Sequence, residues 1–134
     1  ITAPVVVVGG GIAGLSTALG LEGCLLVADE PVGGGSSCLA QGGIAAALGA
    51  DDAPGLHASD TVRVAAGLAD AGIAGLVASA AAGRIAWLRD LGVPFDATPD
   101  GQPLLGREAG HVRDRIVHAG GDRTGAAVMR ALCA

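Results

Sequence analysis

Glycines recur at fixed intervals near the start of the chain, directly after a run of four valines. The segment consists of Gly9, Gly10, Gly11, Ile12, Ala13 and Gly14, which is the pattern G-x-G-x-x-G. In such a turn the first glycine permits a tight bend, the second lets the backbone approach a pyrophosphate, and the last lets a helix pack closely. Free N–H groups at the helix start would then face the phosphates. The pattern predicts a dinucleotide-binding site.

The flanking sequence has the order of elements that this site needs. Residues 4–8 are an apolar run, typical of a strand buried on both faces, and an Ala- and Leu-rich helix is expected over 13–21. A second strand is expected over 24–28. Asp29 follows it, about 20 residues beyond the first glycine, where an acid takes the ribose hydroxyls. Two simpler interpretations stay open: a glycine-rich turn that binds nothing, in a chain with 24 glycines, and Asp29 as a solvated strand-end charge.

Composition limits the remaining possibilities. The 134 residues are at most one domain, and their only aromatic residues are Trp87 and Phe95, so Ala, Val, Leu and Ile must build the core. A net charge of −5 argues against a nucleic-acid partner. Three cysteines, odd in number and without metal spacing, favour a reducing cytoplasmic location and predict no metal site.

Membrane insertion is not expected. Residues 1–28 carry a single charge, Glu22, but the glycine cluster within them and the lack of a basic leader argue against a span or signal peptide. No later stretch is expected to be long enough to span a bilayer. Because the chain begins with Ile1 and not with Met, a few residues are expected to be missing at its start, and it is expected to stop inside its last helix.

Turn and capping signals divide the rest of the chain. Residues 30–43 are expected to form a loop, 44–48 a short helix or strand, and 51–55 a turn. Ser59-Asp60 is expected to cap a helix that runs to about residue 68. Asp70 is expected to cap a longer helix, from about 73 to 91, with an apolar face at Ile73, Leu76, Val77, Ile85 and Leu88.

Gly92 is expected to end the longer helix. A hairpin over 94–106 should turn at 99–101, and Asp122 and Thr124 should begin a final helix. The resulting organisation is a βαβ unit plus loop over 1–49, followed over 50–134 by a helical and hairpin insertion that leads into a truncated helix.

The loop after Asp29 is rich in glycine and serine where a nicotinamide-binding domain would normally enter another helix. Its backbone N–H groups and hydroxyls suit a second patch of cofactor, and small residues let a flat ring approach. A flexible linker is the alternative, but the apolar triplet in its middle argues against one. The candidate cofactor residues are Ser36, Ser37, Cys38, Leu39, Ala40, Gln41, Gly42 and Gly43.

The segment Ser36 to Ala45 resembles the flavin loop of the succinate dehydrogenase/fumarate reductase flavoprotein superfamily. Within it the likeness is strongest to the branch that oxidises L-aspartate to iminoaspartate in quinolinate and NAD synthesis. The other matching segments are 57–61, 66–70, 87–88, 91–96, 106–111 and 115–125. The resemblance covers nearly the whole chain but only the N-terminal part of a family enzyme. It implies an α/β, Rossmann-type FAD-binding domain, present as an N-terminal fragment that is inactive alone.

Two positions distinguish the aspartate-oxidising branch. Members that hold FAD covalently have a histidine where this chain has Ser36, so the resemblance implies non-covalent FAD. Glu108 stands where fumarate reductases carry an apolar residue, and its carboxylate would pair with the substrate ammonium. From the residues alone, a surface ion pair of Glu108 with Arg107 or Arg113 stays open.

The other residues considered as site candidates are expected to lie outside the site. His111 and His118 are expected to be satisfied structural histidines, Trp87 to be core, and Arg113, Arg115 and Arg123 to lie at the surface.

The function expected is FAD-dependent oxidation of L-aspartate, with oxygen or fumarate as acceptor and hand-off of the product to quinolinate synthase. A succinate- or fumarate-type dehydrogenase and a non-catalytic nucleotide-binding module are the alternatives.

Overall fold

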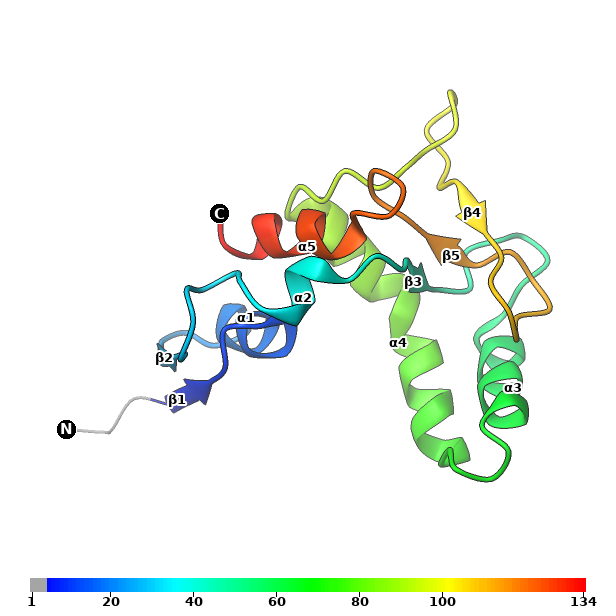
Figure 1. The fold of residues 1–134 in the computed structure, drawn as a ribbon. Helices are drawn as coiled ribbons and strands as arrows, with labels where there is room; N and C mark the ends of the chain where they lie inside the picture. The colour runs from blue at the N-terminus through cyan, green and yellow to red at the C-terminus, as the bar shows by residue number, and fades with distance from the viewer. Residues whose placement is uncertain (1–4) are drawn as a thin grey trace.

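The computed structural model describes residues 5–134, shown in Figure 1. The elements are β1 (Val5–Val8), α1 (Ile12–Leu19), β2 (Cys24–Val27), α2 (Ser36–Leu39), β3 (Ile44–Ala45), α3 (Pro54–Val64), α4 (Ala71–Asp90), β4 (Leu105–Gly106), β5 (Ile116–Val117) and α5 (Thr124–Leu132). Two strands and a helix lie at one end of the molecule, and the helical pair α3 and α4 and a small sheet lie toward the other.

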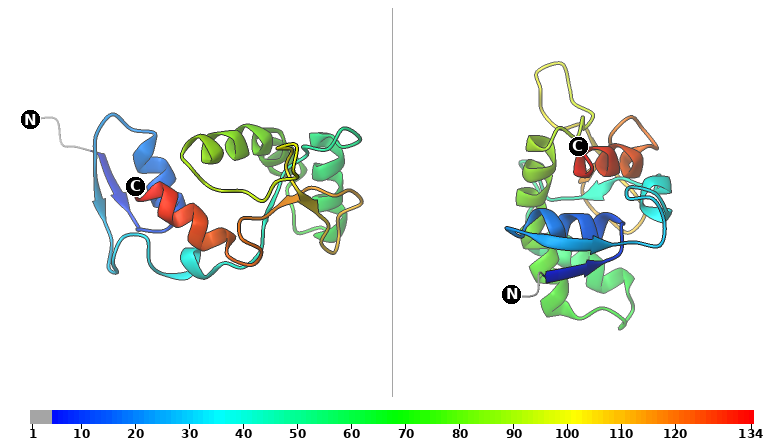
Figure 2. Two further views of the ribbon diagram at one scale, coloured as in Figure 1. Left: turned by 90° about the horizontal axis from the view of Figure 1, so that it is seen from above. Right: turned by 90° about the vertical axis from the view of Figure 1, so that its left-hand side faces the viewer.

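The predicted βαβ unit is confirmed. β1 pairs in parallel with β2, in a register that sets Val5 opposite Cys24 and Val8 opposite Val27, and α1 connects them. Pro4, the expected first strand residue, lies outside the described residues. The expectation of burial on both faces is wrong, because only Val7 is buried while Val8 is 80% exposed. A sheet of two strands with one helix against it leaves its other face open within residues 5–134 (Figure 2).

A second sheet has the antiparallel order β3-β5-β4. Of the two forms expected for residues 44–48, the strand is correct, although it includes only Ile44 and Ala45. The hairpin predicted over 94–106 is confirmed by the antiparallel bridge between Ala97 and Pro103. Its turn contains Gly101 at φ +81°, a conformation that glycine adopts without strain.

Capping signals located one long helix correctly. Asp70 accepts a hydrogen bond from the Ile73 N–H (2.8 Å) at the start of α4, and Gly92, at φ +94°, follows its end. The start predicted for the preceding helix is wrong, because α3 begins at Pro54. Ser59 and Asp60 therefore lie inside α3. The predicted loop 30–43 also needs correction, since residues 36–39 form the single-turn α2.

The apolar face of α4 differs from the predicted one in its first half. Ile73, Leu76 and Val77 are 60%, 68% and 58% exposed, whereas Ala74 and Ala78 are buried. Alanine lets α3 approach α4 closely, so the small residues face the neighbouring helix. By length and composition, with a mean hydropathy of 1.4 over 18 residues, α4 also suffices to cross a membrane, which corrects the expectation that no later stretch does.

The main core joins both ends of the sequence. Leu15 of α1 and Leu88 of α4 pack with Val128, Met129 and Leu132 of α5. Trp87 packs against this cluster, as predicted for a core residue. A smaller cluster connects β3, β5 and α4. Figure 2 shows α5 beside α1, so the last helix packs against the βαβ end of the molecule.

Candidate functional site

The glycine turn and the segment after β2 enclose a pocket of about 230 Å³. Gly9 makes the bend at φ +112°, and its N–H donates to the Val27 carbonyl (2.8 Å), so the turn is anchored to β2. Ile12, Ala13 and Gly14 begin α1. The residues around the pocket are Gly9, Gly10, Gly11, Ala28, Asp29, Glu30, Pro31, Gly34, Gly35, Ser36 and Ser37. Asp29 is exposed at its border, at the predicted place beyond β2.

The turn has room for backbone alone at two of its glycines. A Cβ added at Gly14 would overlap the carbonyl of Gly9, which is why α1 can start so close to the turn. A Cβ at Gly10 would lie 3.1 Å from the Ala28 Cβ, a contact so tight that the neighbouring strand end would have to shift slightly. The turn is therefore a cradle of backbone groups at a helix start, and it fits a pyrophosphate.

Ser37 joins the glycine turn to the flavin-loop segment. Its hydroxyl accepts a hydrogen bond from the Ile12 N–H (3.2 Å), which is one of the free donors at the start of α1. A Cβ at Gly11 would lie 3.0 Å from the same oxygen. The second glycine therefore makes room for Ser37 as well as for a phosphate, which the G-x-G-x-x-G pattern does not indicate.

The remainder of the predicted flavin loop is placed by α2 and α5. Cys38 donates through its thiol to the Gly35 carbonyl (3.0 Å), and Leu39 is 75% exposed. The Ala40 carbonyl accepts from the Gly125 N–H (3.0 Å) at the start of α5. A Cβ at Gly125 would overlap the Ser37 carbonyl, so this glycine permits the close contact between the two helices.

A larger pocket, of about 620 Å³, lies at the other end of the flavin loop. Gln41 and Gly42 line it, whereas Gly43 packs so closely on β5 that a Cβ there would overlap the Val117 carbonyl. The residues around this pocket are Gln41, Gly42, Asp96, Leu104, Leu105, Gly106, Glu108, His118, Gly121 and Asp122.

Glu108 borders the larger pocket without the ion pair that was its alternative role. Arg107 instead pairs with Asp114 (Nε to Oδ1, 2.7 Å), and Arg113 pairs with Asp51 (Nε to Oδ2, 3.2 Å). Both candidate arginines thus have other carboxylate partners within residues 5–134. The Glu108 side chain is exposed where it meets the pocket, so it is accessible to a small cation.

Three residues with polar side chains in this pocket were not predicted as site residues. Asp96 accepts from the N–H groups of Gly120 (2.9 Å) and Gly121 (3.2 Å), and so fixes the turn between β5 and α5. His118, expected to be structural, and Asp122 line the pocket wall. No local pattern in the sequence marks them, because the pocket forms only when the β3-β5-β4 sheet brings distant segments together.

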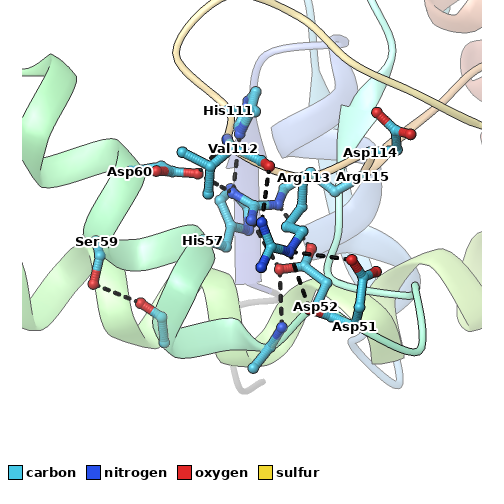
Figure 3. A network of polar contacts seen from close by, with 12 residues as sticks. Asp51, Asp52, His57, Ser59, Asp60, His111, Val112, Arg113, Asp114 and Arg115 are labelled. Carbon is cyan, nitrogen blue, oxygen red and sulfur yellow. Dashed lines mark hydrogen bonds and ion pairs between the residues drawn. The ribbon is translucent and has the colours of Figure 1, made fainter.

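Behind the Glu108 turn lies a buried network of charged residues, shown in Figure 3. Arg115 is fully buried, which corrects the prediction of a surface position, whereas Arg123 is exposed as predicted and Arg113 is 40% exposed in its side chain. Arg115 donates from Nε and Nη2 to the two oxygens of Asp52 (both 2.8 Å) and from Nη1 to Asp60 (2.7 Å).

Two histidines complete the network. His111 Nδ1 lies 3.2 Å from Arg115 Nη1 and, facing a guanidinium, accepts the hydrogen bond. The His57 ring meets the His111 ring edge-on, with centroids 5.6 Å apart. His57 is buried, and its Nδ1 has no hydrogen-bond partner among the described residues, so it is not the satisfied structural histidine that His111 is.

The network stabilises the ionised forms of its two aspartates and its arginine and the neutral form of His57. Burial alone would raise the pKa of Asp52, but hydrogen bonds from Arg115 and the Ala53 N–H hold that pKa below its ordinary value. Hydrogen bonds from Arg63 and from the Val112 N–H lower the pKa of Asp60. The Asp52 hydrogen bond raises the pKa of Arg115, against the effect of burial. Burial and the Arg115 charge lower the pKa of His57 and favour its neutral form.

No group of three His, Cys, Asp or Glu side chains within residues 5–134 is arranged to hold a metal ion. Cys24, Cys38 and Cys133 are free thiols. The site is instead two pockets connected by residues 36–43, one built from backbone donors and one bordered by a carboxylate.

Comparisons with known proteins agree with this geometry. Residues 4–134 match the family described as "FAD binding domain". The chain is 49% identical over 130 residues to the L-aspartate oxidase of Mesorhizobium japonicum, covering 95% of this chain and 25% of that protein. It is 43% identical to the L-aspartate oxidase of Streptomyces coelicolor, covering 98% of this chain and 23% of that protein. The chain thus spans about a quarter of the length of these relatives.

Solved structures give the same result. Mycobacterium smegmatis Sdh1 in complex with UQ1 superimposes with a TM-score of 0.89 at 34% identity, over 97% of this chain and 23% of that one. The FrdA subunit of E. coli quinol fumarate reductase gives a TM-score of 0.90 at 25% identity, over 98% and 23%. The chain therefore belongs to the FAD-binding domain family of the succinate dehydrogenase/fumarate reductase flavoproteins, whose cofactor is FAD.

Proposed function

We propose that the whole protein oxidises L-aspartate to iminoaspartate with a non-covalently held FAD. The observation that carries the proposal is the position of Glu108. Its carboxylate borders a pocket of about 620 Å³, away from both neighbouring arginines, and the flavin-loop residues Gln41 and Gly42 line the same pocket. The similarity to L-aspartate oxidases supports the same reaction.

The residues of the smaller pocket would hold the ADP half of the cofactor in a Rossmann-type manner. The N–H groups of Gly11, Ala13 and Gly14 lie at the start of α1 and would meet the pyrophosphate, while Asp29 would accept from the ribose hydroxyls. When bound, FAD supplies the redox chemistry, taking a hydride from the substrate and passing electrons to oxygen or fumarate. Ser36 offers a hydroxyl where covalent members of the family have a histidine, so the attachment is expected to be non-covalent.

Glu108 would select and orient the substrate. Aspartate and succinate share two carboxylates, and only the ammonium group of aspartate distinguishes them. A carboxylate facing that cation forms a charge-assisted hydrogen bond, which is stronger than a neutral one. The same group faces no partner when succinate is bound, and it therefore contributes to discrimination as well as to affinity.

The experiment compares two activities of the whole protein after the change Glu108→Gln. Aspartate oxidation should fall about ten-fold or more, since a hydrogen bond to a charged group contributes about 1.5–3 kcal/mol. Reduction of fumarate, which has no amino group, should persist. Glu22→Gln is the matched control, because Glu22 is exposed and outside both pockets. Equal losses of both activities would assign Glu108 a structural role, and no change would remove it from the site.

A succinate- or fumarate-type dehydrogenase is the second candidate, supported by the TM-score of 0.89 to Sdh1. Succinate oxidation exceeding aspartate oxidation in the same assay would favour it. Retention of FAD with neither activity would favour a non-catalytic nucleotide-binding module.

For the aspartate oxidase we also propose a cytoplasmic location, which the free cysteines support, without membrane attachment. We propose in addition that its product is handed to quinolinate synthase.

A further inference from the structure

The turn that carries Glu108 is held from outside by α3. Residues 107–114 connect β4 to β5, and the turn is closed at its base by the Arg115 N–H donating to the Gly106 carbonyl (3.0 Å). A side-chain contact within the turn, between Arg107 and Asp114, joins two groups that are each 55% exposed. An exposed ion pair contributes about 0–1 kcal/mol, so local contacts alone hold the turn weakly.

Asp60 of α3 provides the stronger attachment (Figure 3). One of its oxygens accepts from both the Val112 N–H (2.9 Å) and Arg115 Nη1 (2.7 Å). Its other oxygen accepts from Arg63 Nη2 (2.8 Å), and the same nitrogen also donates to the Gly110 carbonyl (2.8 Å). Asp60 is only 4% exposed, and its contact with Arg115 is buried, while those with Val112 and Arg63 are partly buried.

These contacts reach Glu108 through the backbone. The Glu108 carbonyl accepts from the His111 N–H (3.2 Å), and the His111 ring accepts from Arg115. Residues 110–112 are thus fixed to α3, and Glu108 is fixed to them by its hydrogen bond with His111. The position of the Glu108 backbone depends on the charge at Asp60, although Asp60 itself does not line the larger pocket.

We propose that Asp60 is a positioning residue that sets the place of the Glu108 carboxylate and so the discrimination between substrates with and without an ammonium group. The proposal rests on the proposed function. Asparagine at position 60 keeps the size of the side chain and can still accept a hydrogen bond from the Val112 N–H. It removes the negative charge that faces Arg115 and Arg63. Displacing a group by about 1 Å costs up to about 100-fold where geometry is demanding.

The test is Asp60→Asn in the whole, FAD-loaded protein, with kcat and KM measured for aspartate oxidation and for fumarate reduction. The ratio of the two kcat/KM values should fall at least about ten-fold, chiefly through KM for aspartate, while FAD content and fumarate reduction are retained. Asp51→Asn is the matched control, since Asp51 pairs with Arg113 on the same turn but is 81% exposed in its side chain. It should leave the ratio unchanged.

A double-mutant cycle separates positioning from fold stability. In the Glu108→Gln background, Asp60→Asn should change the ratio no further, because the group that it positions is already neutral. Equal losses of both activities, or the same shift in both backgrounds, would overturn the proposal. If Glu108→Gln alone leaves the ratio unchanged, the proposed function fails instead. If Asp60→Asn does not fold, Arg63→Gln, at a side chain 58% exposed, must shift the ratio in the same direction.

Discussion

Gly14→Ala should loosen the phosphate turn, and Gly83→Ala provides its control. Both glycines lie in helices, Gly14 in the first turn of α1 and Gly83 within α4. An added Cβ at Gly83 meets nothing within 4 Å, whereas at Gly14 it meets the Gly9 carbonyl, whose carbon is 2.9 Å away and whose oxygen is closer. Because the obstructing atoms belong to the backbone, no side-chain rotation relieves the contact.

The two variants should change the free energy of unfolding in opposite directions. Alanine in place of glycine stabilises a helix by up to about 1 kcal/mol, and Gly83→Ala should gain most of this. At Gly14 the overpacking costs about 1–3 kcal/mol, so the net change should be a loss. The start of α1 must also move away from the turn. A charge-assisted hydrogen bond is worth about 1.5–3 kcal/mol, so losing one to the pyrophosphate should weaken FAD binding about 10- to 150-fold.

Two measurements on the whole protein check this reasoning. Denaturant unfolding compares the stabilities, and titration of flavin fluorescence with the apoprotein gives Kd for FAD. Gly83→Ala should leave Kd unchanged. The reasoning is refuted if Gly14→Ala binds FAD as tightly as the wild type, because α1 would then tolerate a Cβ where the structure has the Gly9 carbonyl.

Three further predictions concern the surrounding elements. Gly43→Ala should lower stability and flavin content together, because its Cβ would overlap the Val117 carbonyl, and absorbance at the flavin band with thermal unfolding measures both. Asp70→Ala should cost about 1 kcal/mol in denaturant unfolding through loss of the N-cap bond to Ile73, with Asp90→Ala as a control. Because the folded-state pKa of Asp52 is lowered, its stabilisation is fully present above the ordinary Asp pKa of about 4 and is lost as pH falls from there through the lowered pKa. Asp52→Asn should therefore reduce stability at pH 7 and flatten its decrease on acidification; an unchanged slope would contradict this.

Features that depend on neighbouring residues could be predicted from the sequence. The glycine turn, the βαβ order, the Asp70 cap and the turn at residues 99–101 each follow from stereochemistry within a few positions. The helix start at Pro54 was missed because Ser59-Asp60 offered a typical capping pair, although proline at the first helical position is itself a start signal.

Features that depend on distant segments could not be predicted. Arg115 has the composition of a surface residue, and its burial requires Asp52 and Asp60, which lie 63 and 55 positions away. The same limit applies to the first half of α4, where the apolar period holds but Ala74 and Ala78 are buried and Ile73, Leu76 and Val77 are exposed. Burial of charge is decided by compensation across the fold, and single-sequence patterns do not contain it.

The two halves of the site are connected by one short segment rather than by the sheet. Ser36 and Ser37 border the phosphate pocket, and Gln41 and Gly42, four to six positions later, border the pocket of Glu108. The segment is fixed at one end by the hydrogen bond from Ile12 to Ser37 and on α5 by Gly125. Glu108 approaches the same pocket on a turn held by α3. The relative position of cofactor and carboxylate therefore depends on two attachments, Ser37 to α1 and Asp60 to the Glu108 turn, and a change at either one should alter the reaction without touching the substrate.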